Sequence, residues 1–301
     1  MDYRAFEEFC RLNKIEYKKN EPMKFHTSFQ IGGAADLFVC VSSVKQLENV
    51  IPEAKKQSIP YFILGKGSNL LVSDKGIEGI VISLSRMDNI SVEGNYVIAE
   101  AGASLTAVCN TALENGLTGL EFAYGIPGTV GGALYMNAGA YGGEMSDVVS
   151  EAEYIGEDGS TDIIPLSQME LGYRTSVFKK GGKIITKVAF KLGFGDKQEI
   201  KAKMTDFMGR RKDKQPLEYP SAGSTFKRPE GYFAGALIEK NGLKGKTVGA
   251  AQVSEKHAGF VINKGDATCD DVLALIGEIK ETVREADGVE LETEVIFVGR
   301  K

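Results

Sequence analysis

Apolar and polar positions change their spacing repeatedly along this chain, so that strand-like runs alternate with amphipathic segments. The clearest helical pattern covers residues 270–287, where apolar side chains recur every three or four positions. Further helices are expected over 2–14, 44–57, 104–114, 196–214 and 233–241. Strands are expected over 35–41, 61–64, 79–84, 96–101, 151–156, 184–192 and 289–298. This mixture predicts an α+β fold.

Composition narrows the class of protein. At 301 residues the chain is long enough for two or three domains, and 43% hydrophobic with 26% charged residues is typical of a soluble globular protein. No apolar run approaches the roughly 20 residues that cross a bilayer. Four separated cysteines without a C-x-x-C pair fit reduced thiols, so we expect a cytoplasmic protein. Two histidines predict no metal site, and a net charge of −5 predicts no nucleic-acid partner.

Glycines gather in two loops. One is Gly125-Ile-Pro-Gly-Thr-Val-Gly-Gly-Ala133, and the other, Gly65-Lys-Gly-Ser-Asn69, follows the apolar run 61–64. Ordered glycine is costly in entropy, and one reason to keep it is close approach of the main chain to a diphosphate. Ordinary turns are the alternative for either loop alone. Together the loops indicate a large nucleotide cofactor, but Leu70 breaks the Rossmann fingerprint and no Walker A sequence is present.

Six ordered motifs carry a resemblance to a known family. They are His26-Thr-Ser-Phe-Gln-Ile-Gly-Gly-Ala-Ala-Asp36, Gly65–Asn69, Ile126–Ala133, Gly172-Tyr-Arg-Thr-Ser176, Ser221-Ala-Gly-Ser-Thr-Phe-Lys227 and Leu291-Glu-Thr-Glu-Val295. Together they closely resemble the UDP-N-acetylenolpyruvoylglucosamine reductases, in the compact form that lacks an inserted loop with a nucleotide-capping tyrosine. The resemblance implies a reductase of peptidoglycan synthesis with non-covalent FAD, NADPH as co-substrate and a UDP-sugar as substrate.

The resemblance also implies a domain order. An FAD-binding region of the PCMH type, shared with vanillyl-alcohol oxidase, is expected over 1–195, in subdomains 1–58 and 59–195. A substrate domain is expected over 196–288, and residues 289–301 form a strand that returns to the active site. The sequence does not determine the oligomeric state.

Site residues follow motif by motif from the resemblance. The catalytic residues would be Arg174, Ser224 and Glu294. The cofactor would be bound by Gly65, Lys66, Gly67, Ser68, Asn69, Gly125, Ile126, Pro127, Gly128, Thr129, Gly131, Gly132 and Ala133. The substrate would be bound by Tyr173, Lys214, Lys227, Arg228 and His257. Neither glycine loop contains a histidine that could hold flavin covalently.

The chemistry gives each catalytic residue a task. Hydride addition to an enol ether leaves negative charge at the carboxylate end, and the planar fork of Arg174 suits a carboxylate. Ser224 would then donate a proton, with Lys227 as a possible helper. Ordinary alternatives remain open: a structural salt bridge for Arg174, a turn-forming serine at 224, and an exposed edge-strand glutamate at 294. The basic segment 209–214 is either a solvated helix end or a landing site for an anion.

Two other functions remain open on the sequence. One is a different flavin oxidoreductase of the same fold, acting on a sugar or an alcohol. The other is a nucleotide-binding module without catalysis, in which the glycine loops only hold an anion. Bound flavin would separate the redox functions from the binding module.

Overall fold

The computed structural model describes residues 2–156 and 158–301, and the chain forms two compact units. Unit 1 consists of the chain up to Lys18 together with Leu37–Lys66 and Gly79–Arg211. Unit 2 consists of Lys19–Asp36, Gly67–Glu78 and Lys212–Lys301. The units are thus interleaved along the sequence. The domain bounds predicted at residues 58, 195 and 288 stay a prediction.

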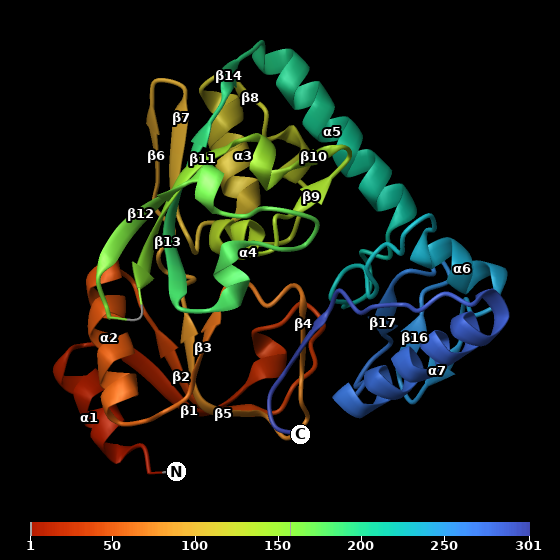
Figure 1. Ribbon diagram of the computed structural model, residues 1–301, viewed down its shortest axis with the longest axis horizontal. Helices are drawn as coiled ribbons and strands as arrows, with labels where there is room; N and C mark the ends of the chain where they lie inside the picture. Colours follow the sequence, from red (N-terminus) through yellow and green to blue (C-terminus); the bar gives the residue numbers. More distant parts are fainter. Residues whose placement is uncertain (1, 157) are drawn as a thin grey trace. The chain divides into compact units, whose positions relative to one another are not determined.

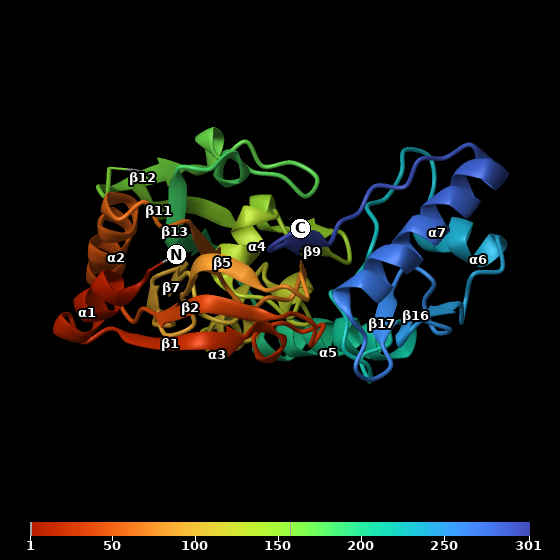
Figure 2. The same cartoon turned by 90° about the horizontal axis from the view of Figure 1, so that it is seen from below.

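A four-stranded sheet with the order β1-β2-β5-β3 begins the fold (Figure 1). Its strands are β1 (Glu16–Pro22), β2 (Ala34–Cys40), β5 (Ile77–Ser83) and β3 (Tyr61–Leu64). β3 and β5 are parallel, and the apolar run Ile80–Ile82 is buried on both faces, as parallel strands usually are. Helices α1 (Arg4–Leu12) and α2 (Val44–Lys56) lie side by side in both views (Figures 1 and 2).

A five-stranded antiparallel sheet forms the second layer of unit 1, in the order β12-β11-β13-β7-β6. Its strands are β6 (Ile90–Glu93), β7 (Tyr96–Glu100), β11 (Val149–Gly156), β12 (Thr161–Pro165) and β13 (Lys183–Lys191). Helices α3 (Leu105–Glu114) and α4 (Val130–Tyr135) pack on it. Each begins at a hydroxyl N-cap, Ser104 or Thr129, whose side chain accepts a backbone amide.

Short elements complete unit 1. They are β8 (Leu117–Thr118), η2 (Glu121–Ala123), β9 (Gly139–Ala140), β10 (Gly143–Glu144), η3 (Met145–Asp147), η4 (Leu166–Gln168), η5 (Val177–Lys180) and β14 (Gly193–Phe194). The long helix α5 (Lys197–Lys214) then follows and is largely exposed. It is anchored in unit 1 by the buried Ile200 and Met204 and by Phe207, whose ring stacks on Tyr141 at 4.8 Å.

Unit 2 is built around the amphipathic helix α7 (Cys269–Asp287), which packs on a small antiparallel sheet and against α6 (Ala234–Lys240) (Figures 1 and 2). The sheet has the order β15 (Thr247–Val248), β16 (Ala251–Val253), β17 (Val261–Asn263). A capping box of Thr268 and Asp271 begins α7, and the left-handed Gly288 ends it. The carboxylate of Asp74 also accepts the amides of residues 269 and 270.

Two further segments belong to unit 2. η1 (Met23–Phe25) follows β1, and β4 (Leu70–Val72) pairs in parallel with β18 (Ile296–Val298) near the end of the chain. The apolar core of unit 2 includes Phe29 and Leu71 from these early segments together with the buried face of α7. Residues about 200 positions apart in sequence therefore share one core.

The predicted helices and most of the predicted strands are confirmed, with the strand 61–64 within the predicted bounds and the helix predicted from 104 beginning at the Ser104 N-cap. The last strand was predicted too long. Instead of a strand over 289–298, only Ile296–Val298 pairs with β4. In residues 291–295 apolar and polar side chains alternate as in a strand, but this segment makes separate contacts with residues 225–227. Within the described residues, no helix is both long and apolar enough to span a bilayer.

Candidate active site

The loop Gly65–Asn69 directly follows β3 and has the character of an anion cradle. None of its five backbone amides donates to another group within the described part of the chain. Gly67 has a φ of +62°, and an added Cβ would lie 2.2 Å from the His26 carbonyl oxygen, so only glycine fits. Consecutive unpaired amides in a glycine-permitted turn can converge on phosphate oxygens. This geometry fits the diphosphate of a nucleotide.

The second glycine loop lies against the first. An added Cβ at Gly65 would lie only 2.5 Å from the Thr129 hydroxyl oxygen. Both predicted cofactor loops therefore meet at Thr129, whose own amide donates to no other group in residues 2–156 or 158–301. The amide of Gly125 is likewise unused. Within unit 1, the amides of Gly125 and Thr129 and those of residues 65 and 66 donate to no other group among the described residues, so they can donate to an anionic cofactor.

The reason for the glycine at position 131 differs from the expected one. We expected the backbone there to approach a diphosphate. Instead, the Gly131 amide donates to the Ala101 carbonyl at 2.9 Å, and an added Cβ would lie 2.8 Å from the Ala101 Cβ. Its neighbour Val130 donates to Ala103. Gly131 thus allows close packing of α4 on the chain after β7, and its amide is already occupied.

Arg211, at the end of α5 in unit 1, is a candidate that the sequence analysis did not single out. Its aliphatic chain packs on Gly125, where an added Cβ would lie 3.0 Å from the arginine Cδ. Burial lowers the pKa of its guanidinium, which has no carboxylate partner among the described residues. Its neighbour Arg210 pairs with Asp206 instead. The basic segment 209–214 indicated a possible anion site in the sequence, but it did not show which of its cations packs on the second glycine loop at Gly125.

Ser224 and Glu294 come together in unit 2. The Glu294 amide donates to the Thr225 carbonyl at 2.9 Å, and Phe226 and Thr293 form an antiparallel bridge. The Asn69 side chain donates to the Glu294 carbonyl at 3.1 Å, and the Ile296 amide donates to Asn69 in return. Residues 224–227, residues 292–296 and Asn69 thus form one hydrogen-bonded strip. It carries the predicted proton donor Ser224, the predicted carboxylate Glu294 and the last residue of the Gly65–Asn69 loop. The Ser224 side chain is exposed and its hydroxyl makes no hydrogen bond with a described residue.

Three further predicted substrate contacts, Lys227, Arg228 and Lys214, belong to unit 2. The Lys227 ammonium pairs with Glu292 at 2.8 Å and lowers the pKa of that carboxyl. It is therefore already engaged, which weakens its expected role as a helper of Ser224. The Arg228 guanidinium lies 4.0 Å from the ring centre of Phe233, a side chain that is 62% exposed. Lys214 is exposed at the end of α5.

His257 connects to the same strip through the backbone. The Gly259 amide donates to His257 Nδ1 at 3.1 Å, so the neutral ring carries its proton on Nε2. The Gly259 carbonyl accepts the Thr225 amide, one residue after Ser224. Burial is the main cause that lowers the pKa of this imidazole below its ordinary value. His257 is thus a neutral donor through Nε2.

This arrangement predicts a pH effect on stability. Because the folded-state pKa of His257 is lowered, the unfolded chain binds more protons, and the free energy of unfolding should fall as pH drops below about 6.5. His257→Gln should flatten this part of the profile, measured by chemical denaturation between about pH 5 and pH 8. His26→Gln, which removes the other histidine, is the matched control. A His257→Gln profile parallel to wild type would contradict the prediction.

Arg174 lies at the tip of a tight turn in unit 1. Gly172 and Thr175 exchange two backbone hydrogen bonds of 3.2 and 3.1 Å, with Tyr173 and Arg174 between them. Arg174 has a φ of +55°, a left-handed conformation that is unfavourable for a residue with a Cβ. Its guanidinium lies 5.2 Å from the ring centre of Tyr173, which is 54% exposed. Strained residues of this kind cluster at functional sites.

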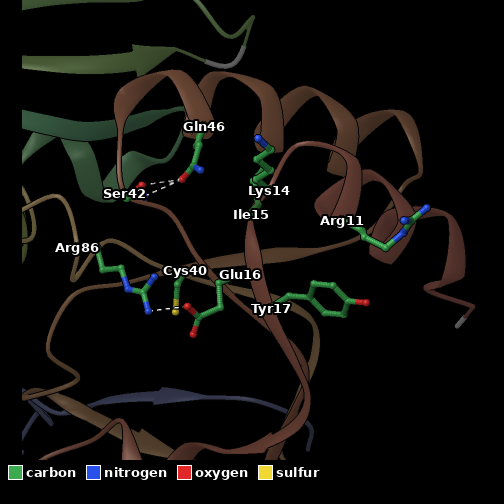
Figure 3. A pocket seen from close by; sticks show the side chains of 9 residues that line it. All are labelled: Arg11, Lys14, Ile15, Glu16, Tyr17, Cys40, Ser42, Gln46 and Arg86. Atoms are coloured by element: carbon green, nitrogen blue, oxygen red, sulfur yellow. Dashed lines mark hydrogen bonds and ion pairs between the residues drawn. The ribbon is translucent and has the colours of Figure 1, made fainter.

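A surface pocket of about 440 Å³ lies elsewhere in unit 1, between α1, β1, β2 and α2 (Figure 3). It contains no predicted site residue. Its arginines are engaged, Arg86 with Glu16 and Arg11 with Glu8, each at 2.5 Å. Among residues 2–156 and 158–301, no three His, Cys, Asp or Glu side chains are grouped to hold a metal ion.

Comparisons with known proteins identify the class and then the family. Residues 35–162 match an FAD binding domain, and residues 215–298 match the family described as UDP-N-acetylenolpyruvoylglucosamine reductase, C-terminal domain. UDP-N-acetylenolpyruvoylglucosamine reductase of Clostridium novyi is 54% identical over 96% of this chain and 94% of its own length. The enzyme of Caldanaerobacter subterraneus is 54% identical over 94% and 93%.

A solved structure agrees. The crystal structure of UDP-N-acetylenolpyruvylglucosamine reductase from Thermus caldophilus covers 94% of this chain and 98% of its own, with 35% identity and a TM-score of 0.81. The chain is a flavoprotein oxidoreductase with an FAD-binding domain and a C-terminal domain. It belongs to the UDP-N-acetylenolpyruvoylglucosamine reductase family. The predicted family, fold class, enzyme class and FAD cofactor are thereby confirmed.

Proposed function

We propose that this chain reduces UDP-N-acetylglucosamine enolpyruvate to UDP-N-acetylmuramate with NADPH, in peptidoglycan synthesis. Membership of the family supports the substrate class. The structural observation that supports the proposal is the strip of unit 2 in which Thr225, the residue after Ser224, is hydrogen-bonded to Glu294, and Glu294 to Asn69. The Ser224 hydroxyl makes no hydrogen bond with a described residue. The loop of the predicted proton donor, the segment of the predicted carboxylate and the end of a predicted cofactor loop are thus joined by backbone bonds and by the Asn69 side chain.

The residues present fit a bound dinucleotide. In unit 1, the amides of residues 65 and 66 and of Thr129, which donate to no other group among the described residues, would donate to its phosphate oxygens. The contacts expected of Gly67, Ser68 and Asn69 stay predictions. Arg211 would supply a cation at the start of the second loop, because its partly buried guanidinium lacks a carboxylate partner within the described residues. Bound FAD, once reduced by NADPH, supplies the hydride for the enolpyruvyl double bond. The protein's own task is to orient the substrate and to manage charge and protons.

Three side chains would carry out that task. Arg174 would stabilise the negative charge that develops at the substrate carboxylate, where its fork can donate two hydrogen bonds. Ser224 would deliver a proton from its hydroxyl to the adjacent carbon, since that hydroxyl is exposed and free of any intrachain acceptor among the described residues. Glu294 would orient the substrate or the serine from the neighbouring position of the strip.

Predicted substrate contacts in unit 2 would bind the nucleotide part of the UDP-sugar. An exposed phenylalanine under a guanidinium, as at Phe233 and Arg228, offers a stacking surface and a positive charge in one place. The Nε2 proton of His257 would donate to a phosphate or carbonyl oxygen, because Nδ1 is already occupied by Gly259. Tyr173, Lys214 and Lys227 stay predicted substrate contacts.

The proposal is tested by the two halves of the reaction. Purified protein should be yellow, or become yellow when FAD is added. Under anaerobic conditions NADPH should then abolish the absorbance of the oxidised flavin. Adding the enolpyruvyl UDP-sugar should then restore the oxidised spectrum, whereas simple alcohols and sugars should not. Restoration by an unrelated substrate would favour another flavin oxidoreductase. A protein that never binds flavin would leave only a nucleotide-binding module.

Replacing Arg174 with lysine separates charge from geometry. The charge is kept but the bidentate fork is lost, so substrate-dependent reoxidation should slow by roughly tenfold, about 1.4 kcal/mol of transition-state stabilisation. Substrate affinity should change less, because the fork acts mainly on charge that develops during the reaction. Stopped-flow absorbance at the flavin band gives the rate. If Arg174 were only a structural ion pair, the variant would lose thermal stability and keep its rate per bound flavin.

A further inference from the structure

Asn137 is a buried polar residue to which the sequence analysis assigned no role. It follows α4, has no solvent exposure, and adopts a left-handed φ of +43°. Asparagine tolerates that conformation better than other residues with a Cβ. The only sequence signal is a polar side chain between Met136 and Ala138 in a glycine-rich segment, which does not identify its partners.

Both ends of the Asn137 amide are engaged. Its Nδ2 donates to the Gly172 carbonyl at 3.1 Å, and its Oδ1 accepts the Ser146 amide at 3.0 Å. A flipped amide would turn Nδ2 toward the Ser146 amide and Oδ1 toward the Gly172 carbonyl, so both hydrogen bonds would be lost. The amide therefore fixes the Gly172 carbonyl relative to the end of α4.

A second tether lies on the other side of Arg174. The buried Ser176 hydroxyl donates to the Tyr135 carbonyl at 2.7 Å. Gly172 precedes Arg174 by two residues and Ser176 follows it by two, so both flanks of the turn are bound to residues 135–137. The same helix, α4, begins at Thr129 in the second glycine loop. All these residues belong to unit 1.

We propose that Asn137 is a positioning residue that holds the Arg174 turn in its strained, catalytically competent conformation. A left-handed arginine reverts to a more favourable backbone unless its surroundings prevent this. The bond to Gly172 fixes the turn at its first residue, where the paired amide and carbonyl of Thr175 close the loop. The inference rests on the proposed role of Arg174. In it, Asn137 fixes the position of the Arg174 side chain relative to the second glycine loop, which contains Thr129.

The test compares Asn137→Gly, which permits the left-handed backbone but removes both side-chain bonds, with wild type. Substrate-dependent reoxidation per bound flavin should slow about tenfold, while flavin reduction by NADPH stays within about twofold. Amide exchange at Thr175, measured by hydrogen–deuterium exchange without substrate, should accelerate by roughly fivefold to tenfold, as expected for loss of one hydrogen bond. Ser176→Ala releases the other tether and should give the same selective pattern if Asn137→Gly fails to fold.

Two controls keep the outcomes separate. Asn95→Ala removes a comparable side-chain bond, from Nδ2 to the Leu192 carbonyl, elsewhere in unit 1, and should lower stability without either selective effect. If Asn137→Gly behaves like Asn95→Ala, the positioning role is overturned. If Arg174→Lys leaves reoxidation unchanged, the proposed role of Arg174 fails. In that case exchange at Thr175 alone decides: acceleration in Asn137→Gly supports control of the turn, and unchanged exchange overturns it.

Discussion

Replacing Ser224 with alanine is expected to slow substrate-dependent flavin reoxidation by about 10²-fold or more, the usual effect of removing a general acid. Flavin reduction by NADPH should stay near the wild-type rate, because that step needs no proton from the serine. The fold should tolerate the change, since the hydroxyl is exposed and makes no hydrogen bond with a described residue. Anaerobic stopped-flow measurement of each half-reaction separates the two rates.

Ser221→Ala is the matched control for this experiment. Ser221 lies three residues earlier in the same loop, and its hydroxyl accepts the Gly223 amide at 3.4 Å. It should perturb the loop locally and leave the two half-reactions in their normal ratio. Equal slowing of both halves in Ser224→Ala would assign the serine to folding or binding and reject it as the proton donor.

Gly67→Ala should have the second large effect, a loss of stability of roughly 2–5 kcal/mol together with loss of bound flavin. The left-handed backbone disfavours any Cβ, and the added carbon would lie 2.2 Å from the His26 carbonyl oxygen. The loop must therefore move, which displaces the backbone amides of residues 65–69. Thermal melting and flavin absorbance of the purified protein measure both consequences.

Gly277→Ala supplies the control in unit 2. Gly277 lies within α7 with open space around it, so alanine should raise stability by about 0.8–1.0 kcal/mol through helix propensity. A yellow Gly67→Ala protein with the wild-type melting temperature would reject the account of this loop.

Local signals were sufficient for much of the fold. Ser104 and Ser43 both begin their helices as hydroxyl caps, and the apolar spacing in 270–287 defines the buried face of α7. These features depend on neighbours within one or two helical turns, which the sequence displays directly. The family motifs added the candidate catalytic residues, whose roles remain proposals.

Long-range partners could not be inferred in the same way. The alternation around Glu294 suggested a strand, but its amide pairs with Thr225, and only Ile296–Val298 joins a ladder. Arg211 and Asn137 were missed because their importance comes from Gly125 and Gly172, which lie far away in sequence. The sequence analysis singled out the glycine at position 131, but could not show that Ala101, which is distant in sequence, leaves no room there for a Cβ.

The strip that joins Asn69 to Glu294 has a consequence for biosynthesis. These residues lie 225 positions apart, and β4 receives its partner β18 only from the final segment of the described chain. A nascent chain therefore exposes the edge of β4 until residues 296–298 have been synthesised, and pairing between such distant segments is intrinsically slow. Flavin capture should accordingly wait until these residues can pair with β4, and chains arrested before residue 296 should stay colourless.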